Sequence, residues 1–137
     1  MMKQADFEAW IMELPNVQRE ENFGYVLFFV GDDRRLPFVT IADIDTEYDQ
    51  VSGLNREGVF RLNIGVSEET FRKLIAGKPA ETIDYSALNE FLPHPHYLRQ
   101  HFVCILNPAG DHVETTKQLI TEAHSLAERR LQRKGGG

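Results

Sequence analysis

The stretch VFRLNIGV, residues 59–66, decides the fold because apolar and polar side chains alternate along it. Leu62 and Ile64 fall on one side of the alternation, and Arg61 and Asn63 fall on the other. In an extended chain, residues two apart lie on the same face. The stretch therefore predicts a strand with one face in the core and a polar opposite face, which requires its own explanation.

Similar reasoning predicts the other elements of the chain. Runs of β-branched and aromatic residues predict further strands over residues 25–30, 37–44 and 101–107. Apolar residues at helical spacing, together with start and stop signals, predict helices over residues 7–14, 67–77 and 112–131, and a short helix over 86–91. The order predicts an α+β domain with an antiparallel sheet of about four main strands and three main helices.

Composition matches one ordinary globular domain. The chain has 137 residues, 42% hydrophobic and 26% charged, so we expect a single domain over residues 1–131 and a flexible basic, glycine-rich tail over 132–137. Its apolar runs are too short to span a bilayer, and its first residues do not resemble a secretory signal, so a cytoplasmic location is expected. Cys104 is the single cysteine, which excludes an intrachain disulfide and a thiolate-rich zinc site.

The charge distribution argues against nucleic-acid binding. The net charge is −6, and the basic residues at positions 129–134 leave residues 1–128 with a net charge of −10. An acidic body repels a polyanion. A DNA-binding alternative would use the basic residues 129–134 together with Arg34 and Arg35 in the turn between the first two predicted strands.

Histidines suggest a second alternative. His94, His96 and His101 fall within eight residues, and three imidazoles converging from a proline-fixed corner could hold a divalent metal with an open water position. No carboxylate motif accompanies them, and His94 and His96 can point apart in an extended backbone. The pattern favours hydrogen-bonding corner residues over a metal-assisted hydrolase, and no cofactor is predicted.

The polar face of residues 59–66 gives the preferred site. Arg61 could bind an anionic group and Asn63 could orient it, with His94 and Tyr97 from the corner closing over them. The alternative is structural: Arg61 pairs with an acid in the region 43–49, and Asn63 satisfies loop backbone. The frequency of buried polar pairing favours the structural interpretation.

Several motifs resemble a known family. They are GVFRLNIGV at residues 58–66, LPHPHY at 92–97, FVCILNP at 102–108 and PFVTI at 37–41. They resemble a family of uncharacterised bacterial proteins that is catalogued as a domain of unknown function, over roughly residues 7–131. The family pattern does not require a histidine at His96, which weakens the three-histidine metal site.

More distantly, the order of elements is similar to the MmcQ/YjbR-like fold. That resemblance implies a strongly bent antiparallel sheet with helices in a double-wing arrangement, and a link by analogy to DNA binding. Fold analogy is weak evidence of function. We therefore expect a binding or regulatory module, not an enzyme, for a small anionic ligand or a protein partner. An uncovered edge strand would also allow a homodimer.

Overall fold

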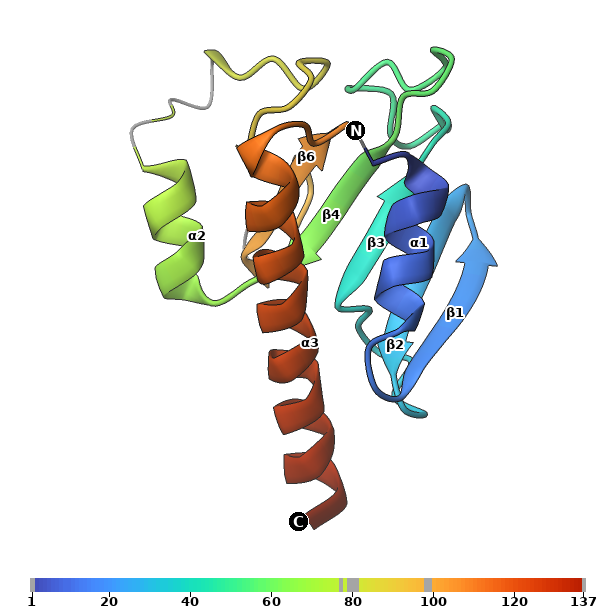
Figure 1. Ribbon diagram of the computed structural model, residues 1–137, viewed down its shortest axis with the longest axis vertical. Helices are drawn as coiled ribbons and strands as arrows, with labels where there is room; N and C mark the ends of the chain where they lie inside the picture. The colour runs from blue at the N-terminus through green and yellow to red at the C-terminus, as the bar shows by residue number, and fades with distance from the viewer. Residues whose placement is uncertain (1, 77, 79–81, 98–99, 137) are drawn as a thin grey trace.

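The computed structural model describes residues 2–76, 78, 82–97 and 100–136. Within these residues, three helices and a six-stranded antiparallel sheet in the order β1-β2-β3-β4-β6-β5 make up the fold (Figure 1). The elements are α1 (Gln4–Met12), β1 (Val17–Asn22), β2 (Tyr25–Val30), β3 (Val39–Ala42), β4 (Arg61–Gly65), α2 (Glu68–Ile75), β5 (Leu92–Pro93), β6 (Phe102–Leu106) and α3 (Asp111–Gly136).

The α+β class and the antiparallel sheet are confirmed, but the strand count differs from the prediction. β1 has one buried residue, Val17, followed by five exposed ones, so it lacks the apolar alternation that would reveal a strand. It is defined by its pairing with β2 along the whole hairpin, from Val17 opposite Val30 to Asn22 opposite Tyr25. The other additional strand, β5, is only two residues long.

The short helix predicted over residues 86–91 is wrong. That segment forms a turn and then runs beside β6, where Leu88 makes an isolated parallel bridge with Leu106. The backbone N–H of Asn89 donates to the carbonyl of Leu106 at 2.6 Å, and Asn89 has a positive φ of 59°. The positive φ interrupts a right-handed helix, and the hydrogen bond to Leu106 takes the place of a helical one, so the helix that composition alone would favour does not form.

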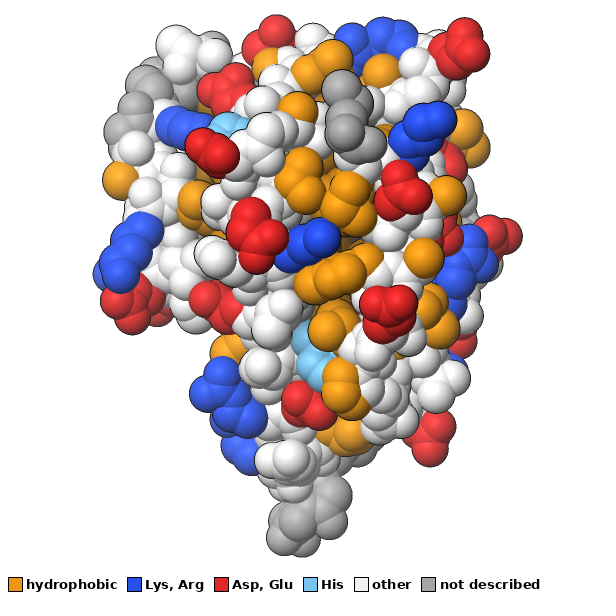
Figure 2. Space-filling view, in the orientation of Figure 1, with side chains coloured by type: hydrophobic (Ala, Val, Ile, Leu, Met, Phe, Trp, Pro, Cys, Tyr) orange, Lys and Arg blue, Asp and Glu red, His pale blue; other side chains and the backbone are white. Residues whose placement is uncertain are grey.

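Two helices cover one face of the sheet (Figure 1). Phe7 and Ile11 of α1 and Ile120 and Ala123 of α3 belong to the same buried cluster as Leu62 and the other inward-facing residues of β2, β3, β4 and β6. Figure 2 shows this helical face, where a band of apolar side chains is flanked by charged ones. The alternation predicted for β4 is confirmed, because its aliphatic residues pack under the helices while Arg61 and Asn63 make their contacts elsewhere.

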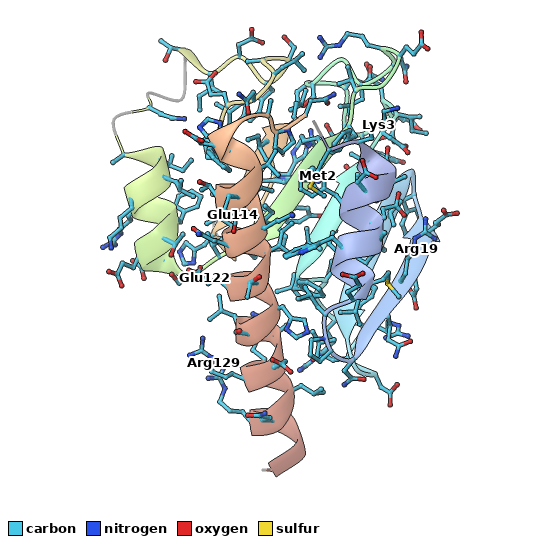
Figure 3. All side chains as sticks on the ribbon, in the orientation of Figure 1. Met2, Lys3, Arg19, Glu114, Glu122 and Arg129 are labelled. Atoms are coloured by element: carbon cyan, nitrogen blue, oxygen red, sulfur yellow. The ribbon has the colours of Figure 1, made fainter. Side chains whose placement is uncertain are left out.

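The start of α2 is as predicted. The Ser67 hydroxyl caps the helix by accepting from the backbone N–H of Thr70 at 3.1 Å. Glu122 of α3 lies toward this end of α2 (Figure 3) and accepts from the Ser67 backbone N–H at 2.9 Å and from the Thr70 hydroxyl at 2.8 Å. Helix α3 therefore anchors α2 as well as the sheet.

Helix α3 runs beyond the predicted end at Leu131. Residues 132–136, expected to form a flexible tail, are helical as far as Gly136. The Leu131 side chain lies against Gly31 in the turn after β2, where an added Cβ would meet Leu131 Cδ2 at 2.8 Å. None of the helices in the described ranges has the length and apolar character that would let it span a membrane.

Candidate ligand-binding cavity on the open face of the sheet

The face of the sheet opposite α1 and α3, here called the open face, carries a cavity of about 610 Å³. On β2 the inward residues Val26 and Phe28 belong to the core, whereas their neighbours point the other way and line the cavity. The lining includes Tyr25, Leu27, Phe29, Thr40, His94, Tyr97 and Phe102, together with Phe23, Arg34 and Arg35. The walls are therefore mostly aromatic and aliphatic, with a few polar groups among them.

Beside the cavity, Arg61 is completely buried and paired with a carboxylate. Its Nη1 donates to Asp49 Oδ1 at 3.2 Å and to Ser52 Oγ at 3.0 Å, and its Nη2 donates to Asp49 Oδ2 at 2.5 Å. Arg61 is 0% exposed and Asp49 is 4% exposed. The structure thus contains the pairing with an acid of the region 43–49 that the structural interpretation predicted.

The electrostatics of this pair keep both groups charged. Burial raises the pKa of Asp49, but hydrogen bonds from Arg61 and Tyr25 outweigh that effect and bring the pKa down to about 2. Burial lowers the pKa of Arg61, whereas the hydrogen bonds and charge of Asp49 raise it, and the net direction is upward. Direct contact between Arg61 and a ligand would require this pair to separate.

Asn63 connects the pair to the cavity wall. Arg61 Nε donates to Asn63 Oδ1 at 2.9 Å, and Asn63 Nδ2 donates to Thr40 Oγ1 at 2.9 Å. Thr40 lies opposite Asn63 in the β3–β4 register, and it lines the cavity while Arg61 and Asn63 lie behind it. The two predicted β4 residues are therefore buried beside the cavity and do not line it.

Tyr25 closes the other side of this network. Its hydroxyl donates to Asp49 Oδ2 at 2.6 Å, and its ring lines the cavity. Burial raises the pKa of Tyr25, and the hydrogen bond to Asp49 raises it further. The phenol therefore stays protonated and serves as a fixed donor to the carboxylate.

His94 lies in the cavity wall, as the prediction of a closing corner required. Its Nδ1 accepts from the backbone N–H groups of His96 at 3.0 Å and Tyr97 at 3.1 Å. Burial lowers its pKa to about 3, and the positive charge of Arg61 adds to this effect. The ring is therefore neutral near neutral pH, and since Nδ1 accepts, the proton resides on Nε2.

Nε2 of His94 is a polar atom of the cavity wall for which the described residues supply no hydrogen-bond partner. Among the residues that the structure describes, none is hydrogen-bonded to it, although His94 is only 2% exposed. The ring itself is held by Tyr97, with ring centroids 5.0 Å apart, and by the edge of Phe102 at 6.3 Å. Tyr97 is 53% exposed and borders the cavity, so it is placed to cover a bound molecule.

The three histidines of the metal alternative do not converge. The rings of His94 and His96 have centroids 6.0 Å apart, and the His101 ring packs instead on Phe71 of α2. Across the described ranges, no group of three His, Cys, Asp or Glu side chains is arranged to hold a metal ion. His94 also accepts two hydrogen bonds at Nδ1, which leaves the proton on Nε2 and no free nitrogen lone pair for a metal.

Comparison with known proteins identifies a family and a fold for this chain and assigns no chemistry to either. The model of a family of unknown function, DUF6194, matches residues 2–136. The chain belongs to the DUF6194 family. A crystal structure of a protein from Pseudomonas syringae matches 92% of this chain and 99% of its own, with a TM-score of 0.61 and 19% identity, which shows a shared fold. A search of curated proteins gives no significant match.

Two arginines complete the cavity of this DUF6194 protein at its mouth. Arg34 donates to Glu20 Oε1 at 2.5 Å and to the Gly31 carbonyl at 2.9 Å, and its guanidinium lies over the Phe29 ring. Arg35 pairs with Asp33 at 3.1 Å. Both arginines line the cavity and are exposed; each is already paired with a carboxylate, so they offer a ligand at the mouth guanidinium N–H groups and little uncompensated charge.

Several residues of the DUF6194 cavity were not singled out from the sequence. Tyr25 and Leu27 lie in a run where every residue is apolar, so alternation gave no sign of which side faces outward. Thr40 belongs to a short strand whose four residues are all buried. The register between β2, β3 and β4, which only pairing defines, brings Leu27 and Thr40 in line with Asn63, and Tyr25 in line with Arg61.

Proposed function

We propose that this DUF6194 protein is a binding module that holds a small, largely apolar molecule with an anionic group in the open-face cavity. The observation that carries the proposal is the combination of a cavity of about 610 Å³ with a buried imidazole, His94, whose Nε2–H has no described partner. Small-molecule sites commonly measure about 300–1,000 Å³ and pair apolar walls with a few polar groups. The arginines at the mouth favour an anion.

The chemistry of the wall supports binding over catalysis. The pKa of His94, about 3, makes it a weak base near neutral pH. Burial raises the pKa of the Cys104 thiol to about 12, so the thiolate that a nucleophile requires is scarce. The Tyr25 phenol is committed to Asp49. The polar groups near the cavity are thus suited to hydrogen bonding and poorly suited to proton transfer.

A cavity-filling substitution tests the proposal. Leu27 lines the cavity and is half-buried, so Leu27→Trp should fill it, while Leu88→Trp places the same side chain at an exposed position outside the lining. The probe is the fluorescent apolar anion 8-anilinonaphthalene-1-sulfonate. We expect one saturable site in the wild type and in Leu88→Trp, and loss of that site in Leu27→Trp. Equal binding by all three folded proteins would contradict the proposal.

A second proposal, polyanion binding by the MmcQ/YjbR-like analogy, has one observation in its favour. The contact of Leu131 with Gly31 brings the carboxyl end of α3 to the turn after β2. Arg35 and Arg130 are close enough for the charge of Arg35 to lower the pKa of Arg130, although burial is the larger cause of that shift. This second proposal also assumes that the protein has the double-wing arrangement of the MmcQ/YjbR-like fold and is located in the cytoplasm.

Salt dependence tests this second proposal. Phosphate contacts make duplex affinity fall steeply with salt concentration. Duplex binding at low salt that weakens in an Arg129→Glu, Arg133→Glu variant would support it; Arg129 lies on the exposed side of α3, away from the sheet (Figure 3). No binding at low salt would remove it.

A further inference from the structure

A chain of directional hydrogen bonds runs from the buried pair to the cavity wall. A guanidinium has donors and no acceptor, so Asn63 must present its oxygen to Arg61 Nε, and this fixes the orientation of the amide. The Asn63 NH2 group then faces Thr40 and donates to Oγ1. Oγ1 accepts this hydrogen bond with one lone pair, so the O–H proton of Thr40 remains to be donated to a ligand.

His94, in the proline-fixed corner at residues 93–97, also offers a hydrogen-bond donor. Two backbone N–H groups point at His94 Nδ1, so this nitrogen is an acceptor and Nε2 carries the proton. The imidazole is fixed in that tautomer by its own turn, since His96 and Tyr97 supply both donors. The wall thus contains a second group that offers a donor.

The buried carboxylate of Asp49 is already satisfied. Both oxygens of Asp49 accept from Arg61, and Oδ2 also accepts from Tyr25. The carboxylate is 4% exposed and its charge is compensated, so it is poorly placed to attract a cation. Thr40 and His94 therefore offer donors to the cavity, while the negative charge of Asp49 is buried and compensated by Arg61.

From this polarity we propose that the cavity selects carboxylates: a ligand with a flat apolar body places its carboxylate oxygens on the Thr40 O–H and the His94 Nε2–H. This inference rests on the proposed function and names its ligand class. The body of the ligand lies against Leu27, Phe29 and Phe102, which line the same cavity. Arg61 and Asn63 act as positioning residues, because they set the direction of the Thr40 hydroxyl without touching the ligand.

Three probes that share one body test the selectivity: 1-naphthoate, 1-naphthylmethylamine and 1-methylnaphthalene, each titrated at pH 7 by fluorescence. We expect 1-naphthoate to bind about tenfold more tightly than the amine, because a hydrogen bond to a charged group is among the stronger ones. Thr40→Val, a near-isosteric change, should weaken 1-naphthoate about tenfold and leave 1-methylnaphthalene unchanged within about twofold. Thr40→Ser retains the hydroxyl and should retain the preference.

His94→Phe provides the second variant, so the inference stays testable if Thr40→Val does not fold. It keeps a planar ring and removes the donor, and the same selective loss of 1-naphthoate is expected. Equal affinity of the wild type for the acid and the amine, or an unchanged acid preference in both folded variants, would overturn the carboxylate inference; binding of 1-methylnaphthalene would then still support a cavity that binds small molecules. Failure of all three probes to bind the wild type would overturn the proposed function as well.

Discussion

Arg61 holds both carboxylate oxygens of Asp49, through Nη1–Oδ1 at 3.2 Å and Nη2–Oδ2 at 2.5 Å. The guanidinium comes from a central strand, while the carboxylate comes from the long loop between β3 and β4. The pair therefore fastens that loop onto the open face of the sheet. Buried ion pairs contribute little on balance when intact, but removal of one partner leaves an uncompensated charge in the interior.

Asp49→Ala should accordingly destabilise the protein by about 3–5 kcal/mol, since Arg61 would remain buried and lose two hydrogen bonds. Urea unfolding measures the change. The double variant Arg61→Met, Asp49→Leu is the matched control, because it removes both charges and should recover most of the loss. A loss below about 1 kcal/mol in Asp49→Ala would show that the guanidinium finds other compensation.

The same pair predicts an acid dependence. The pKa of Asp49 is about 2 in the folded protein, below its ordinary value of 3.8, so the ionised form is favoured in the fold. The resulting stability is present above about pH 4 and disappears as the pH falls toward about 2, with a total of roughly 2 kcal/mol. Unfolding free energy measured against pH should show this slope in the wild type and lack it in Asp49→Asn. Equal slopes below pH 4 would contradict the assignment.

Much of the fold could be predicted because β4 alternates strictly and Ser67 caps α2. β1 could not be predicted, because nearly all its residues are exposed and an exposed edge strand needs no alternation of apolar and polar residues. Its pairing with β2 is what defines it as a strand. The sequence also suggested that Arg61 pairs with a nearby acid. Which acid it is depends on how the loop folds back over β4, and that is a tertiary property.

The candidate site was predicted in part. Arg61, Asn63, His94 and Tyr97 do gather on the open face, as alternation and the proline-fixed corner indicated. The burial of Arg61 could not be predicted, because it depends on the loop that carries Asp49 and Ser52 folding onto it. Sequence alternation predicts the face of a sheet to which a residue points. Whether the residue is exposed or buried there depends on what packs against that face.

His94 predicts a second pH dependence, in a different range. Its pKa falls to about 3 in the fold from an ordinary value of 6.5, so the neutral ring is favoured and the unfolded chain takes up a proton first on acidification. The folded protein should lose stability as the pH falls from about 6.5 toward 3, by up to about 1.4 kcal/mol per pH unit. His94→Phe should remove this component between about pH 6 and 4.5. An unchanged slope in that variant would mean that His94 is solvated.

The last prediction concerns the turn of the hairpin between β1 and β2. Its two turn residues, Phe23 and Gly24, have φ values of 55° and 82°, a conformation that favours Asn or Gly and disfavours a bulky side chain. Phe23 is 82% exposed and lines the cavity, so its strain is not offset by burial. Phe23→Asn should therefore raise the unfolding free energy by about 0.5–1 kcal/mol.

Phe23→Asn should also weaken ligand binding, because it removes an aromatic side chain from the cavity mouth. Phe23→Asn should weaken 1-naphthoate and 1-methylnaphthalene to a similar degree, since it removes apolar contact and leaves the Thr40 and His94 donors in place. Gly24→Ala is the contrasting control: an added Cβ would meet Thr46 Cγ2 at 2.8 Å and should destabilise the turn. If Phe23→Asn lowered stability, the ring would have to make contacts that its exposure argues against. If it stabilised the fold with no effect on either probe, Phe23 would have no part in binding.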